Sequence, residues 1–311
     1  MPVPHLTLST DGLDLAYLRE RPENLERLLE HQRIRETPLP SGRACRAQRL
    51  TLDDGTDLFT KTLGVPSPFD ASSRAGPPAG FFEAEATGLR WLGEARTVRV
   101  PEVISVSPSR LVLTWVEPGP ANLDAMTELG RALAGLHASG APSFGVRWAG
   151  FIGVLPLDNT PAERWPAFYA EQRVLPYLRL AVDAGRIDAD DVRAVESVLA
   201  RLDDLGGPPE PPARLHGDLW SGNLICARDG HTYVVDPAAH GGHRETDLAM
   251  LALFGAPHLG ALLDAYDEAA PLADGWRDRV AVHQLHPLLV HAATFGGDYG
   301  SRAGAAARRY G

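Results

Sequence analysis

Hydrophobic positions in the first part of the chain predict a helical start followed by a strand pair. Residues 13–36 carry leucines and one isoleucine at helical spacing among many charges. Residues 38–42 contain two prolines, a serine and a glycine, which is typical of a turn. Two strands are expected within residues 46–62, because strand-forming residues flank Asp53-Asp54-Gly55, a hairpin signal.

The next segments predict a loop, a helix and two further strands. Residues 66–80 consist mainly of proline, serine, glycine and alanine, which offer little to bury, so we expect a mobile loop. A helix is predicted over 81–95, and strands over 103–107 and 111–116. The Glu117-Pro-Gly-Pro120 sequence interrupts this pattern and places a domain boundary after residue 117.

The rest of the chain is mainly helical. Apolar residues recur at i, i+3, i+7 and i+10 from Met126, as in an amphipathic helix. Further predicted elements are helices at 165–184 and 188–205, strands at 224–226 and 232–235 around Asp229-Gly230, and helices after about 245. The pattern predicts an α+β protein with a β-rich N-terminal lobe (1–117) and a mainly helical C-terminal lobe (118–311) that contains a hairpin.

The composition limits the number of domains and the classes of protein that the chain can belong to. The chain has 311 residues, of which 44% are hydrophobic and 23% charged, enough for about two domains with a normal core. Its net charge of −10 argues against a non-specific nucleic-acid binder and against docking on an anionic membrane. Two distant cysteines exclude a disulfide scaffold, and the absence of a signal-peptide pattern or a long apolar run favours a soluble cytoplasmic protein.

One polar block carries the main candidate chemistry. Asp218 and Asn223 lie five residues apart ahead of the second hairpin, and Asp236 follows that hairpin. The protein-kinase catalytic loop has the same order: an Asp base, an Asn metal ligand five residues later and a downstream Asp that holds magnesium. Asp218 is therefore the candidate base, and Asn223 and Asp236 are candidate ligands for a hard cation. Asp and Asn are also common turn residues, so the spacing alone is weak evidence.

Phosphoryl transfer also requires a cation for the nucleotide phosphates. Lys61 lies in the second predicted strand, where a kinase lysine is expected, although a strand lysine alone is more often solvent-facing. A glutamate on the following helix would pair with it, and Glu83 and Glu85 are the candidates. Glu85 shares a helix face with Leu89 and Leu92, whereas Glu83 lies on the polar face. A buried Glu85 needs a cation, so we predict a Lys61–Glu85 pair.

The sequences of these motifs and of the residues around them resemble those of the fructosamine/ketosamine-3-kinase family. The matching segments are His216-Gly-Asp-Leu-Trp-Ser-Gly-Asn223, Asp236-Pro-Ala-Ala-His-Gly-Gly-His-Arg-Glu-Thr-Asp-Leu-Ala-Met250, Leu253-Phe-Gly255, Trp165-Pro-Ala-Phe-Tyr-Ala-Glu-Gln-Arg173 and Thr294-Phe-Gly-Gly-Asp-Tyr299. The resemblance covers about residues 35–300. Aminoglycoside phosphotransferases and choline kinases share the shorter His-Gly-Asp-x4-Asn core.

This resemblance implies a protein-kinase-like two-lobe fold and Mg²⁺- and ATP-dependent phosphorylation of the 3-hydroxyl of a ketosamine, a deglycation reaction. It supports the roles given above to Lys61, Glu85, Asp218, Asn223 and Asp236. It also places the adenine-contacting hinge at Thr114, Trp115, Val116 and Glu117.

Several positions depart from the family pattern. The phosphate-covering loop is not glycine-rich: only Gly42 is available there, so Ser41 and backbone N–H groups are expected to contact the phosphates. Leu157, His283 and His286 replace residues that are usual in the family. His283 and His286 are predicted to lie one helical turn apart, but no acidic residue stands near them at ligand spacing to complete a metal site.

Three residues are candidates for contact with the acceptor. Trp220, next to the candidate base, could form a wall for a sugar face, and His286 and His291 are candidates by analogy with the family.

Two other functions stay open at this point. One is a kinase of the same fold that acts on an aminoglycoside or on choline. The other is a catalytically silent nucleotide-binding protein, which the retention of Lys61, Glu85, Asp218, Asn223 and Asp236 together disfavours. The sequence leaves the oligomeric state undetermined.

Overall fold

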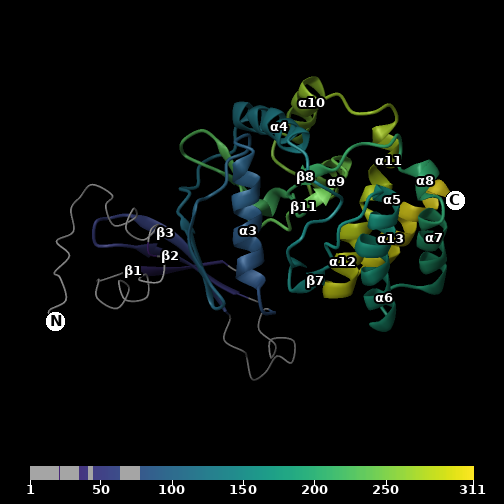
Figure 1. The fold of residues 1–311 in the computed structure, drawn as a ribbon, viewed down its shortest axis with the longest axis horizontal. Helices are drawn as coiled ribbons and strands as arrows, with labels where there is room; N and C mark the ends of the chain where they lie inside the picture. The colour runs from purple at the N-terminus through teal and green to yellow at the C-terminus, as the bar shows by residue number, and fades with distance from the viewer. Residues whose placement is uncertain (1–20, 22–34, 41–44, 64–77) are drawn as a thin grey trace. The chain divides into compact units, whose positions relative to one another are not determined.

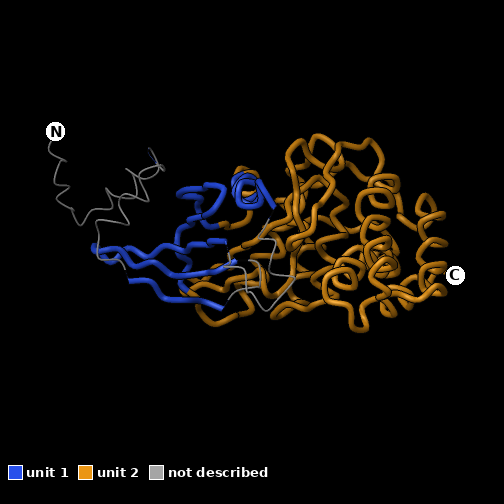
Figure 2. The backbone as a smooth tube through the Cα atoms, turned by 90° about the horizontal axis from the view of Figure 1, so that it is seen from below, with its two compact units in different colours: residues 1–90, 101–117 blue, residues 91–100, 118–311 orange. Residues whose placement is uncertain are grey.

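A computed structural model of the chain describes residue 21 and residues 35–40, 45–63 and 78–311 (Figure 1). Residues 13–20 and 22–34 of the helix expected at 13–36, residues 66–77 of the loop expected at 66–80, and the candidate phosphate-loop residues Ser41 and Gly42 lie outside these described residues. The described chain forms two compact units, residues 1–90 with 101–117 and residues 91–100 with 118–311 (Figure 2). One break thus falls between Glu117 and Pro118, while residues 91–100 group with the second unit instead of the first.

The first unit is built on an antiparallel five-stranded sheet with the strand order β1-β2-β3-β5-β4. Its elements are β1 (Arg35–Leu39), β2 (Cys45–Thr51), β3 (Asp57–Leu63), α3 (Phe81–Glu94), β4 (Val103–Ser107) and β5 (Arg110–Thr114). The β2–β3 hairpin confirms the turn signal at Asp53–Gly55, and α3 and the β4–β5 pair confirm the predicted helix and strands. Lys61 of β3 lies opposite Ala47 on β2 and Leu111 on β5, so it occupies a central strand.

The prediction for residues 35–39 was wrong. Residues Arg35–Leu39 form an edge strand paired with β2, where a helix end and a turn were expected. This strand is exposed on both faces apart from Leu39, so no alternation of apolar residues marks it in the sequence.

The second unit is mainly helical. Its helices are α4 (Leu123–Ala138), α5 (Trp165–Phe168), α6 (Leu175–Asp183), α7 (Ala189–Leu199), α8 (Leu202–Leu205), α9 (Glu245–Phe254), α10 (Leu259–Ala269), α11 (Trp276–His283), α12 (Leu285–Phe295) and α13 (Tyr299–Ala307). A π-helical segment, Tyr169–Val174, joins α5 to α6, and 3₁₀ turns occupy Ser221–Asn223 and Arg308–Tyr310. Three short antiparallel strand pairs complete it: β6 (Gly150–Ile152) with β7 (Leu155–Leu157), β8 (Ala213–Leu215) with β11 (His240–Gly242), and β9 (Leu224–Cys226) with β10 (Thr232–Val234).

Two apolar clusters form the core of the second unit. The first joins residues of α5 to α7 with α12 and α13 and includes Trp165, Tyr169 and Leu285. The second joins α4, α9 and α10 and also takes in Leu219 of the loop after β8, which is fully buried. Leu219 therefore anchors this loop in the core, directly beside Asp218.

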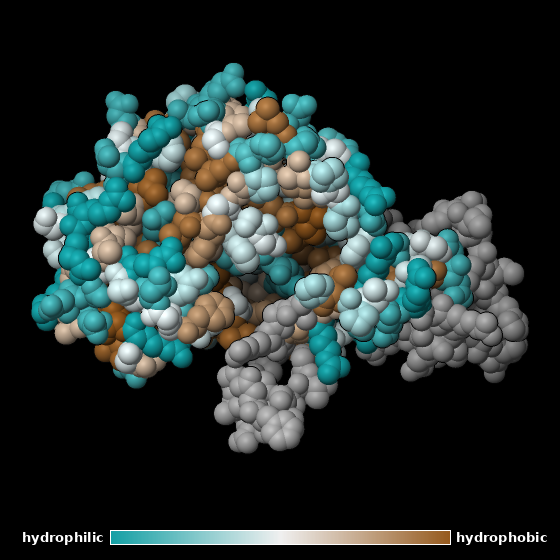
Figure 3. Space-filling view, turned by 180° about the vertical axis from the view of Figure 1, so that it is seen from behind, coloured by the Kyte–Doolittle hydropathy of each residue, from teal (hydrophilic) through white to brown (hydrophobic). Residues whose placement is uncertain are grey.

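Surface features of the described residues are ordinary for a globular chain. On the face shown in Figure 3, hydrophobic residues lie in patches among hydrophilic ones. Large apolar side chains that are exposed include Leu123, Leu180, Trp220 and Phe295. Among the helices that the structure describes, none is both long and apolar enough to cross a bilayer.

Candidate functional site

The first unit holds a buried lysine–glutamate pair. The Nζ of Lys61 lies 2.9 Å and 3.1 Å from the two carboxylate oxygens of Glu85. The two side chains are only 12% and 8% exposed, so water screens this pair weakly. The carboxylate fixes the lysine ammonium group at one position on the central strand of the sheet.

Helix α3 explains why Glu85 takes this role. Glu85 shares the buried face of the helix with Leu89 and Leu92, which are fully buried. Glu83, on a different face, is only partly buried, and its Oε2 has no hydrogen-bond partner. The helical spacing in the sequence therefore predicted the glutamate that forms the ion pair with Lys61 in the structure.

The segment after β5 is the candidate hinge. Thr114 ends the strand, and its N–H donates a hydrogen bond to the carbonyl oxygen of Glu102. The indole N–H of Trp115 donates to Glu117 at 2.8 Å, while the guanidinium of Arg49 stacks on the Trp115 ring at 4.7 Å. These contacts fix the side chains of the hinge on the sheet of the first unit.

In the second unit, the loop after β8 carries the candidate base. Gly217 has a φ of +81°, and a Cβ there would lie 2.2 Å from the carbonyl oxygen of Ala238. Only glycine fits this position, because the backbone approaches its neighbour too closely for any side chain. After Gly217, Asp218 is partly exposed on the loop, and Leu219 is fully buried in the core.

Asp218 and Asn223 are held together by hydrogen bonds. The Nδ2 of Asn223 donates to the Asp218 carbonyl oxygen at 2.8 Å and to its carboxylate Oδ2 at 3.0 Å. The amide donor therefore orients the carboxylate. The same two hydrogen bonds identify Nδ2 as the side of the amide that faces Asp218. The Oδ1 of Asn223 is therefore the atom that can bind a cation.

His216 links this loop to Asp236. Its Nδ1 accepts a hydrogen bond from the Asp218 N–H at 3.2 Å, so its Nε2 carries the proton and donates to the Val235 carbonyl at 2.9 Å. Burial lowers the pKa of His216, which keeps the ring neutral. The N–H of Val235 in turn donates to the Asn223 carbonyl oxygen at 3.0 Å. His216 thus positions the loop, as expected from its place before the base.

Asp236 follows directly in a left-handed backbone conformation, with a φ of +54°. Such a conformation is uncommon for a residue other than glycine and is often found at functional sites. Because the adjacent Val235 is hydrogen-bonded to Asn223, Asp236 lies beside the loop that carries Asp218 and Asn223. A carboxylate from Asp236 and the amide Oδ1 of Asn223 form an oxygen donor set that suits Mg²⁺, a hard cation.

Another aspartate, Asp247 on α9, is buried and supports the backbone of this loop. Its carboxylate accepts hydrogen bonds from the backbone N–H groups of His216 at 2.8 Å and Gly217 at 2.9 Å. His137 of α4 lies 3.3 Å from the same carboxylate. Burial alone would raise the pKa of Asp247, but the hydrogen bond and the electrostatic interaction with His137, together with the hydrogen bond from Gly217, outweigh it and lower that pKa. Sequence analysis did not identify this residue, because no local pattern distinguishes it within an apolar helix.

Aromatic side chains extend from the loop along α9, α12 and α13. Trp220 is 38% exposed, and Gly222 lies against its ring: a Cβ on Gly222 would be 2.3 Å from the indole. The chain of ring contacts runs from Trp220 to Phe254 at 6.2 Å, from Phe254 to His291 at 4.7 Å, and from His291 to Phe295 at 5.4 Å and Tyr299 at 4.9 Å. We call these five residues the aromatic array.

His286 is not part of this array. It is only 4% exposed, and its Nδ1 donates to the backbone carbonyl of Arg173 at 2.8 Å. The sequence predicted that His283 and His286 lie one turn apart on one helix. This prediction was wrong, because His283 ends α11 and His286 belongs to α12. Of the three substrate candidates, the structure groups Trp220 with His291 and places His286 in the core.

A sheet unit with a lysine–glutamate pair and a helical unit with an Asp–Asn loop define the protein-kinase-like fold of phosphotransferases that act on hydroxyl groups. The crystal structure of a spectinomycin phosphotransferase in complex with ADP and spectinomycin shares this fold, with a TM-score of 0.53 at 12% identity over 90% of this chain and 88% of that chain. The chain has this fold.

Comparison with known sequences is more specific. The fructosamine kinase family model matches residues 72–310. A probable ketoamine kinase of Enterococcus faecium (strain ATCC BAA-472 / TX0016 / DO) is 38% identical over 231 residues, which cover 72% of this chain and 80% of that protein. The crystal structure of a provisionally assigned fructosamine-3-kinase from Thermobifida fusca YX-ER1 is 46% identical, with a TM-score of 0.83 over 97% of this chain and 99% of that chain. The chain belongs to the fructosamine kinase family.

The two glutamates of α3 provide a matched test of the lysine pair. Glu85→Gln removes the charge that holds the Lys61 ammonium, so we expect kcat/KM for ATP to fall about 10²-fold, the usual effect of a misplaced positioning group. Glu83→Gln removes the same charge two residues away and should change kcat/KM less than about threefold. Steady-state kinetics with varied ATP measure both. Equal losses in the two variants would contradict the assignment.

Proposed function

We propose that this protein transfers the γ-phosphoryl group of ATP to a sugar hydroxyl of a ketosamine, the 3-hydroxyl in the case of a fructosamine. The observation that carries this proposal is the Asp218 carboxylate, which the Asn223 amide orients at 3.0 Å in a loop held by Asp247. The names of the relatives, a probable ketoamine kinase and a provisionally assigned fructosamine-3-kinase, support the choice of acceptor.

In this proposal Asp218 is the general base. The acceptor oxygen forms a bond to the γ-phosphorus, the bond from that phosphorus to the β–γ bridging oxygen breaks, and ADP leaves. The hydroxyl proton passes to the Asp218 carboxylate as the new bond forms. Asn223 keeps the carboxylate facing the acceptor, which limits the reorganisation needed before transfer.

Lys61 supplies positive charge to the nucleotide phosphates. Because Glu85 holds its ammonium group at 2.9 Å and 3.1 Å, the lysine is preorganised and pays little rotamer entropy on binding ATP. The hinge residues Thr114, Trp115, Val116 and Glu117 are proposed to bind adenine through their backbone groups. The roles of Ser41 and Gly42 at the phosphates remain predictions from the sequence.

Asn223 and Asp236 are the residues that would hold Mg²⁺. Their oxygen donors fit a hard cation, and the Asn223 amide is already turned so that Oδ1 can act as a ligand. A bound Mg²⁺ neutralises phosphate charge that develops during transfer. The hydrogen bond from the Val235 N–H to the Asn223 carbonyl oxygen links the backbone segments that carry these two ligands.

The aromatic array is the proposed acceptor site. Trp220 adjoins the base, and Phe295 at the other end is 69% exposed. Flat aromatic surfaces stack well on sugar faces and also attract cations such as the protonated amine of a ketosamine. Burial lowers the pKa of His291, so its ring is neutral near pH 7 and does not repel that amine.

A panel of acceptors tests the proposal. We expect wild-type enzyme with Mg²⁺-ATP to phosphorylate fructosyl-, ribulosyl- or erythrulosyl-lysine, and mass spectrometry to locate the phosphate on the sugar. Kanamycin and choline are the comparison substrates, since kinases of the same fold use such acceptors and aromatic rings also bind quaternary amines. If the enzyme phosphorylates kanamycin or choline but no ketosamine, the proposed acceptor is refuted, whereas the assignment as a phosphotransferase stands. If no acceptor of the panel supports ADP release, both the ketosamine acceptor and the phosphoryl transfer are refuted.

The acceptor site has its own test. Phe295→Ser removes an exposed ring of the aromatic array, so KM for the ketosamine should rise roughly tenfold, the effect of losing 1–2 kcal/mol of stacking. The ATP KM should not change. Leu123→Ser is the matched control, because Leu123 is 53% exposed on α4. An identical acceptor KM in wild type and Phe295→Ser would remove the array from the acceptor site.

A further inference from the structure

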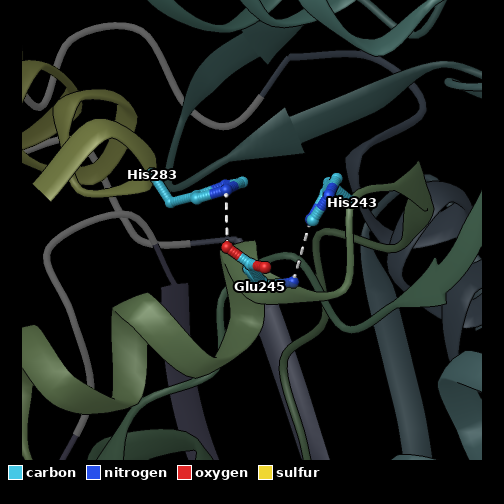
Figure 4. A group of neighbouring side chains, drawn as sticks. All are labelled: His243, Glu245 and His283. Carbon is cyan, nitrogen blue, oxygen red and sulfur yellow. Dashed lines mark hydrogen bonds and ion pairs between the residues drawn. The ribbon is translucent and has the colours of Figure 1, made fainter. Parts of the chain in front are cut away.

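Three buried side chains of the second unit converge away from the catalytic loop. His243 precedes α9, Glu245 begins α9, and His283 ends α11. Their exposures are 3%, 2% and 0%, and one ligand atom from each lies within 4.8 Å of the other two. In Figure 4 a dashed line joins the His283 ring to the Glu245 carboxylate, whereas the His243 ring is joined to the backbone nitrogen of Glu245. We call these three residues the His–Glu–His group.

His283 contains a polar atom without a hydrogen-bond partner. Its Nδ1 lies 3.0 Å from the Thr246 hydroxyl, but its buried Nε2 has no hydrogen bond. The nearest acidic atom, Oε2 of Glu245, is 3.5 Å away, which is too long for a good N–H···O bond. A buried nitrogen without a partner is costly and is a reason to look for a missing ligand.

His243 places its Nδ1 beside Glu245, where its one lone pair is engaged in a hydrogen bond that a bound ion would have to replace. Its Nδ1 accepts a 3.2 Å hydrogen bond from the backbone N–H of Glu245, so this nitrogen carries no proton. Its Nε2 lies 3.9 Å from the carboxylate of Glu210. A carboxylate behind the far nitrogen of a histidine is a usual supporting contact for a metal ligand.

Arg279 is the strongest argument for a purely structural group. Its guanidinium donates to both oxygens of Glu245, at 2.6 Å and 3.1 Å, and so compensates the carboxylate charge. This pair nevertheless gives His283 Nε2 no partner. Each carboxylate oxygen has two lone pairs, so Arg279 can hold Glu245 in place while Oε2 accepts a cation as well.

A pocket supplies a route to the group. It has a volume of about 290 Å³, and His243, Glu210 and Trp165 are among the residues that line it. An ion could therefore reach His243 without unfolding of the core. A water molecule could also enter from the pocket to complete the coordination.

We propose that His243, Glu245 and His283 bind one Zn²⁺-class transition-metal ion. Two imidazoles and one carboxylate are a common ligand set for zinc, with a fourth position left for water. Ligand atoms about 2.0–2.2 Å from a tetrahedral ion lie roughly 3.4 Å apart, close to the 3.5 Å between His283 Nε2 and Glu245 Oε2. Because the ligand atoms of the group lie up to 4.8 Å apart, His243 has to move inward on binding. The ion fastens the start of α9, which carries Asp247, to the end of α11.

Metal content and stability test this site on the whole protein. Chain prepared without a metal-binding tag and dialysed against a chelator is titrated with Zn²⁺ alone, with calorimetry and thermal unfolding as readouts. We expect one ion per chain and a Tm increase of roughly 5 °C when free Zn²⁺ exceeds Kd about 100-fold. His243→Gln and His283→Gln should each weaken binding at least tenfold.

Control variants identify where the ion binds. His286→Gln alters an equally buried histidine three residues from His283, and Asp236→Ala alters the proposed magnesium ligand; both should bind Zn²⁺ like wild type. A wild type without a Zn²⁺-dependent Tm shift, or ligand variants that bind as tightly as wild type, would overturn the site. Loss of binding in Asp236→Ala would do the same.

Co²⁺ gives a readout that needs no variant. Wild-type protein with one equivalent should show the intense visible absorption of a four- or five-coordinate ion, unchanged by saturating Mg²⁺-ATP. A weak six-coordinate spectrum, or a band that Mg²⁺-ATP removes, would refute the proposal.

Discussion

The carboxylate of Asp247 is buried where helix α9, helix α4 and the loop after β8 meet. A buried carboxylate is tolerated only when donors surround it, and here the N–H groups of His216 and Gly217 and the ring of His137 do so. This requirement fixes the loop backbone two residues before Asp218. The orientation of Asp218 by Asn223, and the link from His216 through Val235 to Asp236, are built on that fixed backbone. The catalytic geometry thus depends on the cost of leaving one buried charge unsatisfied.

Much of the fold follows from local sequence signals. The predicted turn at Asp53–Gly55, the helix predicted over 81–95 and the amphipathic helix predicted from Met126 are confirmed, because turn chemistry and apolar periodicity act over a few residues. Strand β1 was missed because an exposed edge strand needs no apolar face and obtains its pairing from β2. The strands β8 and β11 are three residues each and are defined by each other across the chain, so no local window reveals them.

The candidate site divides in the same way. Glu85 could be chosen over Glu83 because a helix face is a local property, and Asp218, Asn223 and Asp236 follow from their spacing. Asp247 could not be chosen, because its donors come from α4 and from the loop before Asp218. The His–Glu–His group was missed for the same reason: the acid that accompanies His283 is Glu245, far back in the sequence, whereas its sequence neighbour His286 faces Arg173. Where function depends on contacts between distant segments, only the three-dimensional structure reveals it.

The central claim is that Asp218 accepts the proton of the acceptor hydroxyl, and the turnover of Asp218→Asn tests it most directly. The amide is nearly isosteric but cannot take the proton, so kcat should fall about 10²–10⁴-fold while calorimetric ATP affinity stays within about threefold of wild type. Asp264→Asn, an exposed residue on α10, is the control and should retain wild-type kcat. A folded, ATP-binding Asp218→Asn enzyme with wild-type kcat would contradict the account.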